Sequence, residues 1–159
     1  MKSLKQKSLS VLVAAAAAGM LGLTGCAQMQ GWMGMGSAQA ASDAQRVTLS
    51  GSNENPAISS SGSATGDVTV KADGSVSGTI KVTGFTPTAA HIHQGAHGAN
   101  GPVIVPMTKQ GDDTFVFPPN AKLTPEQLTA YKAGNTYVNV HSAAHPGGEV
   151  RAQLKGSGS

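Results

Sequence analysis

Alternation of apolar and polar side chains with a period of two is the feature that most constrains the fold of this chain. In DVTVKADGSVSGTIKV, residues 67–82, valine and isoleucine alternate with Thr, Ser and Lys on both sides of Asp73-Gly74. An Asp-Gly pair between two alternating runs is a strong signal for a tight hairpin turn. The pattern therefore predicts a two-stranded antiparallel ribbon with one apolar face.

Short strands bounded by turn residues are expected along the rest of the folded part of the chain. They are predicted at residues 46–51, 89–94, 102–107, 113–117, 136–142 and 148–154. Many short strands at such spacing are typical of sandwiches and barrels. Together with the ribbon they predict an all-β fold, an antiparallel β-sandwich or barrel of about eight strands.

One short helix is expected between these strands, in LTPEQLTAYKAGN, residues 123–135. Thr124 suits the N-cap, Pro125 the first helical position, and Gln127 completes a capping box. Gly134 suits the left-handed residue that ends a helix. The segment therefore predicts a short crossover helix that closes one end of the sandwich.

The N-terminal segment resembles a bacterial lipoprotein signal peptide. A positively charged start precedes an apolar run, residues 11–23, that is too short to span a bilayer comfortably. Leu23-Thr24-Gly25-Cys26 then resembles a lipobox, the cleavage motif of lipoproteins. The resemblance implies a signal peptide over residues 1–25 and a lipidated Cys26 at the start of the mature protein.

This resemblance also implies a location and a division of the chain. Several acyl chains on Cys26 make a stable anchor, and Ala27 after the cysteine implies transfer to the outer membrane in enteric-type bacteria. We expect a lipid-anchored protein of the bacterial outer membrane that faces the periplasm or the cell surface. Cys26 and a flexible tether would occupy residues 26–45, one domain residues 46–155, and a disordered tail residues 156–159.

The charge balance gives no indication of nucleic acid as a partner. Three of the eleven Lys and Arg residues lie within residues 1–25, so eight remain against eight Asp and Glu. A protein without a basic patch lacks the footprint of phosphate binding. The expected partners are the membrane, through Cys26, and a protein of unspecified kind.

All five histidines lie in two short segments, residues 89–107 and 137–154. Strand alternation places Ala90 and Ile92 toward the core, so His91 and His93 face the other way, with Cα atoms about 6.6–7 Å apart. The same phase puts Val138 and Val140 inside and His141 outside. If the two strands are neighbours, the three imidazoles converge on one outer face.

Three neutral imidazoles that converge can bind copper or zinc. His97 and His145, in the loops after these strands, are candidates for a further ligand. Glu149 and Arg151, expected on the outer face of the last strand, could form an ion pair or orient His141. The alternative is that the histidines bind no metal and only pin glycine-rich loops to the sheet through hydrogen bonds.

Several motifs together resemble the CHRD domain, a module named for chordin. They are AHIHQG at 90–95, GANGPV at 98–103, YVNVHS at 137–142 and PGGEVRAQL at 146–154, with NENP at 53–56 similar to the opening segment. The resemblance covers residues 46–154 and departs from the family at Ala152, where Gly is more usual. It implies an immunoglobulin-like or barrel-like β fold. In chordin the module belongs to an extracellular protein that binds growth factors.

A weaker resemblance of pattern is to Cu/Zn superoxide dismutase, which also implies an antiparallel β-sandwich or barrel. It would put His91, His93 and His141 at copper-ligand positions and Arg151 at the position of an arginine that guides anions. The chain departs from that pattern because it has no disulfide, no obvious acidic zinc ligand and no clear bridging histidine. The sequence thus leaves three hypotheses, a binding module with copper or zinc, a metal-free structural or interaction domain, and a dismutase-like enzyme.

Overall fold

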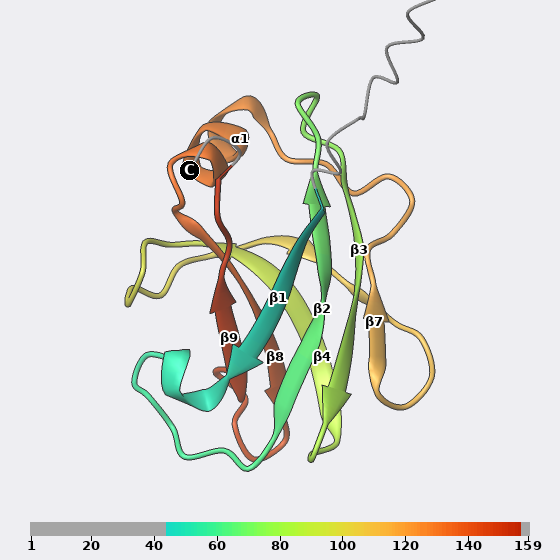
Figure 1. The fold of residues 1–159 in the computed structure, drawn as a ribbon, viewed down its shortest axis with the longest axis vertical. Helices are drawn as coiled ribbons and strands as arrows, with labels where there is room; N and C mark the ends of the chain where they lie inside the picture. The colour runs from blue at the N-terminus through green and yellow to red at the C-terminus, as the bar shows by residue number, and fades with distance from the viewer. Residues whose placement is uncertain (1–43, 157–159) are drawn as a thin grey trace, which may run out of the picture. The chain divides into compact units, whose positions relative to one another are not determined.

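A computed structural model describes residues 44–156, and the predictions for the signal peptide, Cys26 and most of the tether lie outside the described residues. Nine strands, a 3-10 turn and one helix make up this part of the chain (Figure 1). The strands are β1 (Ala44–Ser50), β2 (Ser63–Val70), β3 (Val76–Thr83), β4 (Pro87–Gln94), β5 (Val103–Pro106), β6 (Thr108–Lys109), β7 (Thr114–Val116), β8 (Thr136–Ser142) and β9 (Val150–Gln153). The turn is η1 (Gly51–Asn53) and the helix is α1 (Pro125–Lys132).

The nine strands form a single antiparallel sheet in the order β5-β4-β8-β9-β1-β2-β3-β7-β6. β5 and β6 stand at opposite ends of this order, yet only Met107 separates them along the chain. The Met107 N–H donates to the Ala90 carbonyl of β4 at 3.0 Å. The two edges therefore meet, and the sheet closes into a nearly complete barrel, which confirms the predicted all-β class.

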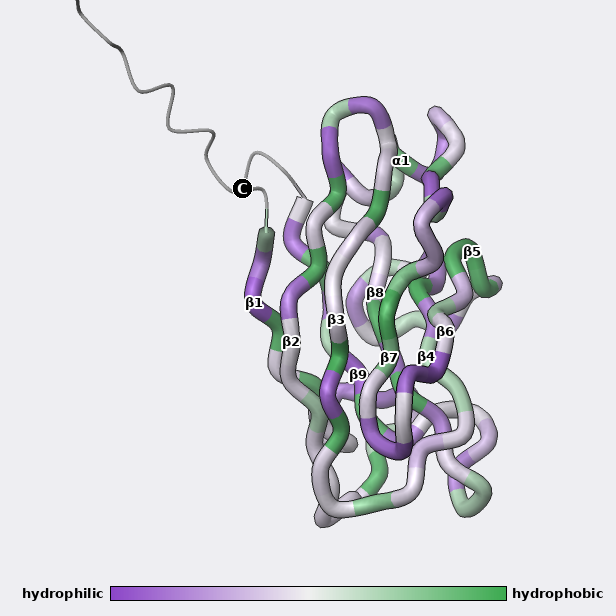
Figure 2. The backbone as a smooth tube through the Cα atoms, turned by 90° about the vertical axis from the view of Figure 1, so that its right-hand side faces the viewer, coloured by the Kyte–Doolittle hydropathy of each residue, from purple (hydrophilic) through white to green (hydrophobic). Residues whose placement is uncertain are grey.

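The barrel interior is filled by the apolar half of each alternating strand. Figure 2 shows apolar and polar residues following one another along β2 and β3. Fully buried members include Leu49, Val68, Ile80, Ile92, Phe115, Val138, Val140 and Val150. Each such side chain stabilises the fold by about 1.5–3 kcal/mol relative to an exposed one, so the sequence alternation accounts for both the strand phase and the core.

The helix forms where its capping residues predict it. Thr124 accepts from the Gln127 N–H, and the Gln127 side chain accepts from the Thr124 N–H, so the capping box is complete. α1 carries the chain from β7 to β8, which have four other strands between them in the sheet order. Its buried Tyr131 belongs to the apolar core, and the helix lies at one end of the barrel (Figure 1).

Two features of the sheet differ from the sequence prediction. β2 begins at Ser63, five residues before the alternation at Val68, because Ser63–Gly66 continue the register with β1. The two-residue β6 was not predicted, since two exposed residues carry no alternation to detect. Within residues 44–156, no helix has the length and apolar character needed to cross a bilayer.

Candidate metal centre

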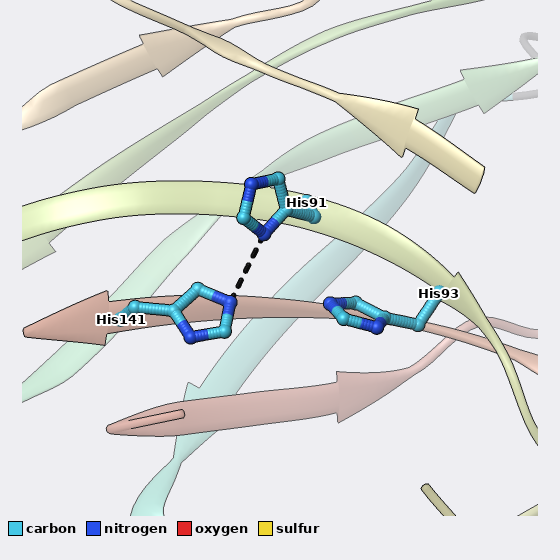
Figure 3. A group of neighbouring side chains, drawn as sticks. All are labelled: His91, His93 and His141. Atoms are coloured by element: carbon cyan, nitrogen blue, oxygen red, sulfur yellow. Dashed lines mark hydrogen bonds between the residues drawn. The ribbon is translucent and has the colours of Figure 1, made fainter. Parts of the chain in front are cut away.

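His91, His93 and His141 lie together on the outer face of the barrel, where β4 and β8 are neighbours (Figure 3). Nδ1 of His91 is 3.0 Å from Nε2 of His141. The ring centroid of His93 lies 5.6 Å from that of His91 and 6.0 Å from that of His141. Each residue offers one ligand atom, and these atoms all lie within 4.8 Å of one another.

Two backbone carbonyls orient the imidazoles. Nδ1 of His93 is 2.9 Å from the Gly101 carbonyl, and Nδ1 of His141 is 3.0 Å from the Pro146 carbonyl. A carbonyl oxygen only accepts, so both Nδ1 atoms carry the proton and both Nε2 atoms keep a lone pair. Metal-binding histidines have this arrangement, with the far nitrogen held by a carbonyl or carboxylate.

One ring nitrogen of the cluster and the side chain of a neighbouring residue, Asn139, include buried polar atoms without a partner. Among the described residues, buried side-chain atoms without a hydrogen-bond partner are Glu54 Oε1, His93 Nε2, Thr136 Oγ1 and Asn139 Oδ1. Asn139 is paired across the sheet with His91 on one side and Arg151 on the other. A buried unpaired polar atom costs about 1–3 kcal/mol, and Nε2 of His93 is such an atom within the cluster.

An aromatic and cationic stack supports His93 from the side. The Tyr137 ring lies parallel to the His93 ring, with 4.9 Å between centroids and an interplanar angle of 7°. The guanidinium carbon of Arg151 lies 3.4 Å from the Tyr137 centroid. Because β8 lies between β4 and β9, Tyr137 joins His93 on one side to Arg151 on the other.

The outer face of β8 is covered by loops. All seven residues of β8 are buried, and Arg151 is only 1% exposed. Its guanidinium donates to the carbonyls of Ala96 and Ala99. The side-chain amide of Asn100 donates to the Asn55 carbonyl, and the side-chain amide of Asn55 donates to the Gly98 carbonyl. These two hydrogen bonds join the loop that contains Asn55 to the loop that contains Gly98 and Asn100. Alternation placed these side chains outward correctly but could not show what covers them.

The loop histidines lie outside the cluster. His97 is exposed, and Nε2 of His145 is 3.8 Å from the Glu149 carboxylate. Neither belongs to the group of residues that could share one ion. The structure therefore brings three of the five histidines together as candidate ligands.

Glu149 and Arg151 contact neighbours other than the expected ones. Glu149 is buried and accepts hydrogen bonds from Ser142 and Ser60. Burial raises the pKa of Glu149, but these two hydrogen bonds more than offset it and hold the pKa below its usual range. The carbonyl of Pro146, not Glu149, orients His141.

Arg151 does not offer a positive charge to solvent. Its acceptors are two carbonyls and the side-chain oxygens of Asn100 and Gln153. Since the guanidinium lies beneath the loop of residues 95–101, it is not placed to guide an anion from solution.

The loop residue Glu54 is the feature that the sequence interpretation missed. It was noted only as part of a motif, although it is 9% exposed and leaves one carboxylate oxygen unpartnered. A carboxyl in a loop gives no alternation signal. Glu54 packs against Gly148, where the absence of a side chain permits close approach, because a Cβ there would lie 2.5 Å from Glu54 Oε1.

Burial keeps the cluster uncharged. The pKa of His91 falls to about 4, through burial first and then through the neighbouring His141 and His93. Burial also lowers the pKa of His93 and of His141. All three imidazoles are therefore neutral at pH 7, the form in which they bind a metal.

The free energy of unfolding of the metal-free protein should consequently fall in acid. Between pH 6.5 and about 4 the unfolded chain binds more protons at His91 than the folded chain does. We expect His91 to account for a loss of about 1–2 kcal/mol across this window, after discounting for its partial exposure. Urea unfolding of the wild type and of His91→Asn at pH 7 and pH 4.5 measures it.

Glu54 acts in the opposite direction, so the comparison between the two proteins is essential. Burial raises the pKa of Glu54 to about 7, and the stability that its proton contributes is lost as the pH rises from 4.5 through 7. Both proteins contain Glu54, so its contribution cancels in the difference. An equal loss of stability in acid for wild type and variant would contradict the prediction for His91.

The geometry is compatible with one ion. Histidine nitrogens lie 2.0–2.1 Å from zinc, and two ligands of a tetrahedral ion are about 3.3 Å apart. In the cluster, Nδ1 of His91 and Nε2 of His141 are 3.0 Å apart, and no two candidate ligand atoms are more than 4.8 Å apart. These separations lie on either side of the tetrahedral value. Since Nε2 of His141 holds a lone pair, His91 must donate the proton between them through Nδ1. Nδ1 of His91 could hold an ion only after that proton moved to Nε2 of the same ring, which would keep the imidazole neutral.

Fold and site together define a class of protein, a small antiparallel β-barrel with a three-histidine cluster under its surface loops. The chain belongs to the CHRD domain family, because the family model described as CHRD domain matches residues 45–154. This confirms the resemblance seen in the sequence. No curated protein and no solved structure matches the chain.

Proposed function

We propose that this CHRD domain is a binding module that holds one copper or zinc ion through His91, His93 and His141. The observation that carries the proposal is the orientation of the ligand atoms. Two Nδ1–H groups are held by the carbonyls of Gly101 and Pro146, which turns two Nε2 lone pairs toward the cluster. The unpartnered, buried Nε2 of His93 is the group that an ion would satisfy.

Metal stoichiometry tests the proposal. Equilibrium dialysis of the purified protein against Zn(II) or Cu(II) should give about one ion per chain at this site. His93→Asn should lose that ion, because the asparagine amide can still donate to the Gly101 carbonyl but has no atom at the position of Nε2. His97→Asn is the matched control, since His97 is exposed and lies outside the cluster. Equal metal content in all three proteins would refute the site.

The alternative function is a metal-free structural or protein-interaction domain. The hydrogen bonds from His93 and His141 to two loop carbonyls favour it, because they tie the loops to the sheet without any ion. In that case His93→Ala should lower the free energy of unfolding by about 1–3 kcal/mol in the presence of a chelator. His93→Asn would leave both the stability and the binding of a protein partner unchanged.

The anchor and the location are also proposals. We propose that the domain is anchored at the bacterial outer membrane, facing the periplasm or the cell surface. The lipobox-like Leu23-Thr24-Gly25-Cys26 sequence and Ala27 support this proposal. Cys26→Ser should remove acylation and shift the protein from the membrane fraction to the soluble fraction. Retention of the variant in the outer membrane after a carbonate wash would contradict the lipid anchor.

A further inference from the structure

We propose that Arg151 makes the three-histidine site selective for the ion of lower charge, so that Cu(I) is favoured relative to the dications Zn(II) and Cu(II). This inference rests on the proposed metal-binding function. It starts from an unusual feature of the structure, a fully buried arginine beside a cluster of metal-type ligands.

Arg151 belongs to no ion pair in the described part of the chain. The ion pairs there are Lys81 with Asp113 and His145 with Glu149. Each hydrogen bond of the guanidinium goes to a neutral oxygen, and its face lies on the Tyr137 ring. Buried charges are normally paired, and a guanidinium remains protonated in proteins. A full positive charge is therefore fixed behind the site.

The charge is close enough to act on a bound ion. The guanidinium carbon is 3.4 Å from the Tyr137 centroid, and that centroid is 4.9 Å from the centroid of His93. Buried charges at this range are screened little by salt.

The ligands themselves add no compensating charge. The cluster consists of three neutral imidazoles, and no Asp or Glu among the described residues joins it. The nearest compensating group is Glu54, whose carboxyl interacts with Arg151 but whose pKa is raised to about 7 by burial. At an effective dielectric constant near 20, repulsion by the Arg151 charge lowers the affinity of the site by about ten-fold or more for each unit of positive charge on the ion. A dication is therefore penalised about ten-fold more than a monocation.

Affinities of the full-length protein for Cu(I) and Zn(II) test the proposal. Each ion is supplied at pH 8 by a competing chelator, and the Cu(I) titration is carried out in the absence of oxygen. His93→Asn serves as the baseline, because subtracting the metal that this variant binds removes any contribution from other parts of the chain. The quantity compared is the ratio of the two association constants at the histidine site.

Three variants should change this ratio in different ways. Arg151→Gln keeps an amide donor but removes the charge, and it should lower the Cu(I)-to-Zn(II) ratio about ten-fold. Arg151→Lys keeps the charge and should leave the ratio within about three-fold of wild type. Glu54→Gln removes the nearby carboxylate and should raise the ratio several-fold.

The outcomes separate this inference from the proposed function. Metal binding that His93→Asn does not reduce would refute the site itself. A genuine site whose ratio is the same in wild type, Arg151→Gln and Glu54→Gln would refute charge selection while leaving the site intact. If circular dichroism shows that Arg151→Gln is unfolded, Glu54→Gln decides the matter, and an unchanged ratio overturns the inference.

Discussion

Zinc at about a thousand times its dissociation constant should raise the free energy of unfolding of the protein by about 4 kcal/mol. An ion that binds only the folded state stabilises it by mass action, and the three imidazoles come together only when β4 and β8 pair. For a domain of this size the shift in Tm should be roughly 10–20 °C. Differential scanning calorimetry with zinc and with a chelator measures it.

The histidine variants make this result specific. His93→Asn and His141→Asn should unfold at the same temperature with and without zinc, because each keeps its hydrogen bond to a loop carbonyl and loses Nε2. His97→Asn should keep the whole shift. A zinc-dependent shift that survives in His93→Asn would mean that the metal stabilises the protein from another place.

Gly101→Ala should both destabilise the protein and weaken metal binding. A Cβ at position 101 would lie 1.7 Å from the carbonyl oxygen of Gln94, so the loop backbone must move. Overpacking of this kind costs about 3 kcal/mol. The carbonyl that orients His93 moves with the loop, and loss of such a contact weakens metal affinity by about 10–100-fold. Urea unfolding and zinc titration measure the two effects.

Gly147→Ala provides the matched control. Gly147 also lies in a loop beside the cluster, next to the Pro146 carbonyl, but a Cβ there would meet nothing within 4 Å. Its stability should remain within about 0.5 kcal/mol of wild type, with unchanged zinc affinity. If Gly101→Ala behaved like Gly147→Ala, the Gly101 carbonyl would not be what holds His93.

Burial on both faces explains why β8 is central to this domain. Val138 and Val140 fill the barrel, while Tyr137, Asn139 and His141 fill a second layer under the loops. That second layer is polar, so each group in it needs a partner. The loop carbonyls and the π face of Tyr137 serve several of them, whereas Nε2 of His93 and Oδ1 of Asn139 have no partner.

Much of the fold followed from local patterns. The hairpin at Asp73-Gly74, the capping box at Thr124 and the inward phase of Ile92 and Val138 each depend on side chains close together along the chain. Local propensity and period-two alternation act within a few residues, and a sequence displays them directly. The start of β2 and the short β6 were missed because pairing with a neighbour, not alternation, defines them.

The candidate site divides in the same way. That His91, His93 and His141 share an outward orientation is a property of strand phase, which the sequence by itself determined. That β4 and β8 are neighbours, that loops bury Arg151, and that Glu54 lies behind the cluster were decided only by the tertiary structure. The physical reason is that alternation specifies the side of a strand on which a residue lies, whereas the order of strands and the path of loops arise from contacts between segments 40 to 100 residues apart.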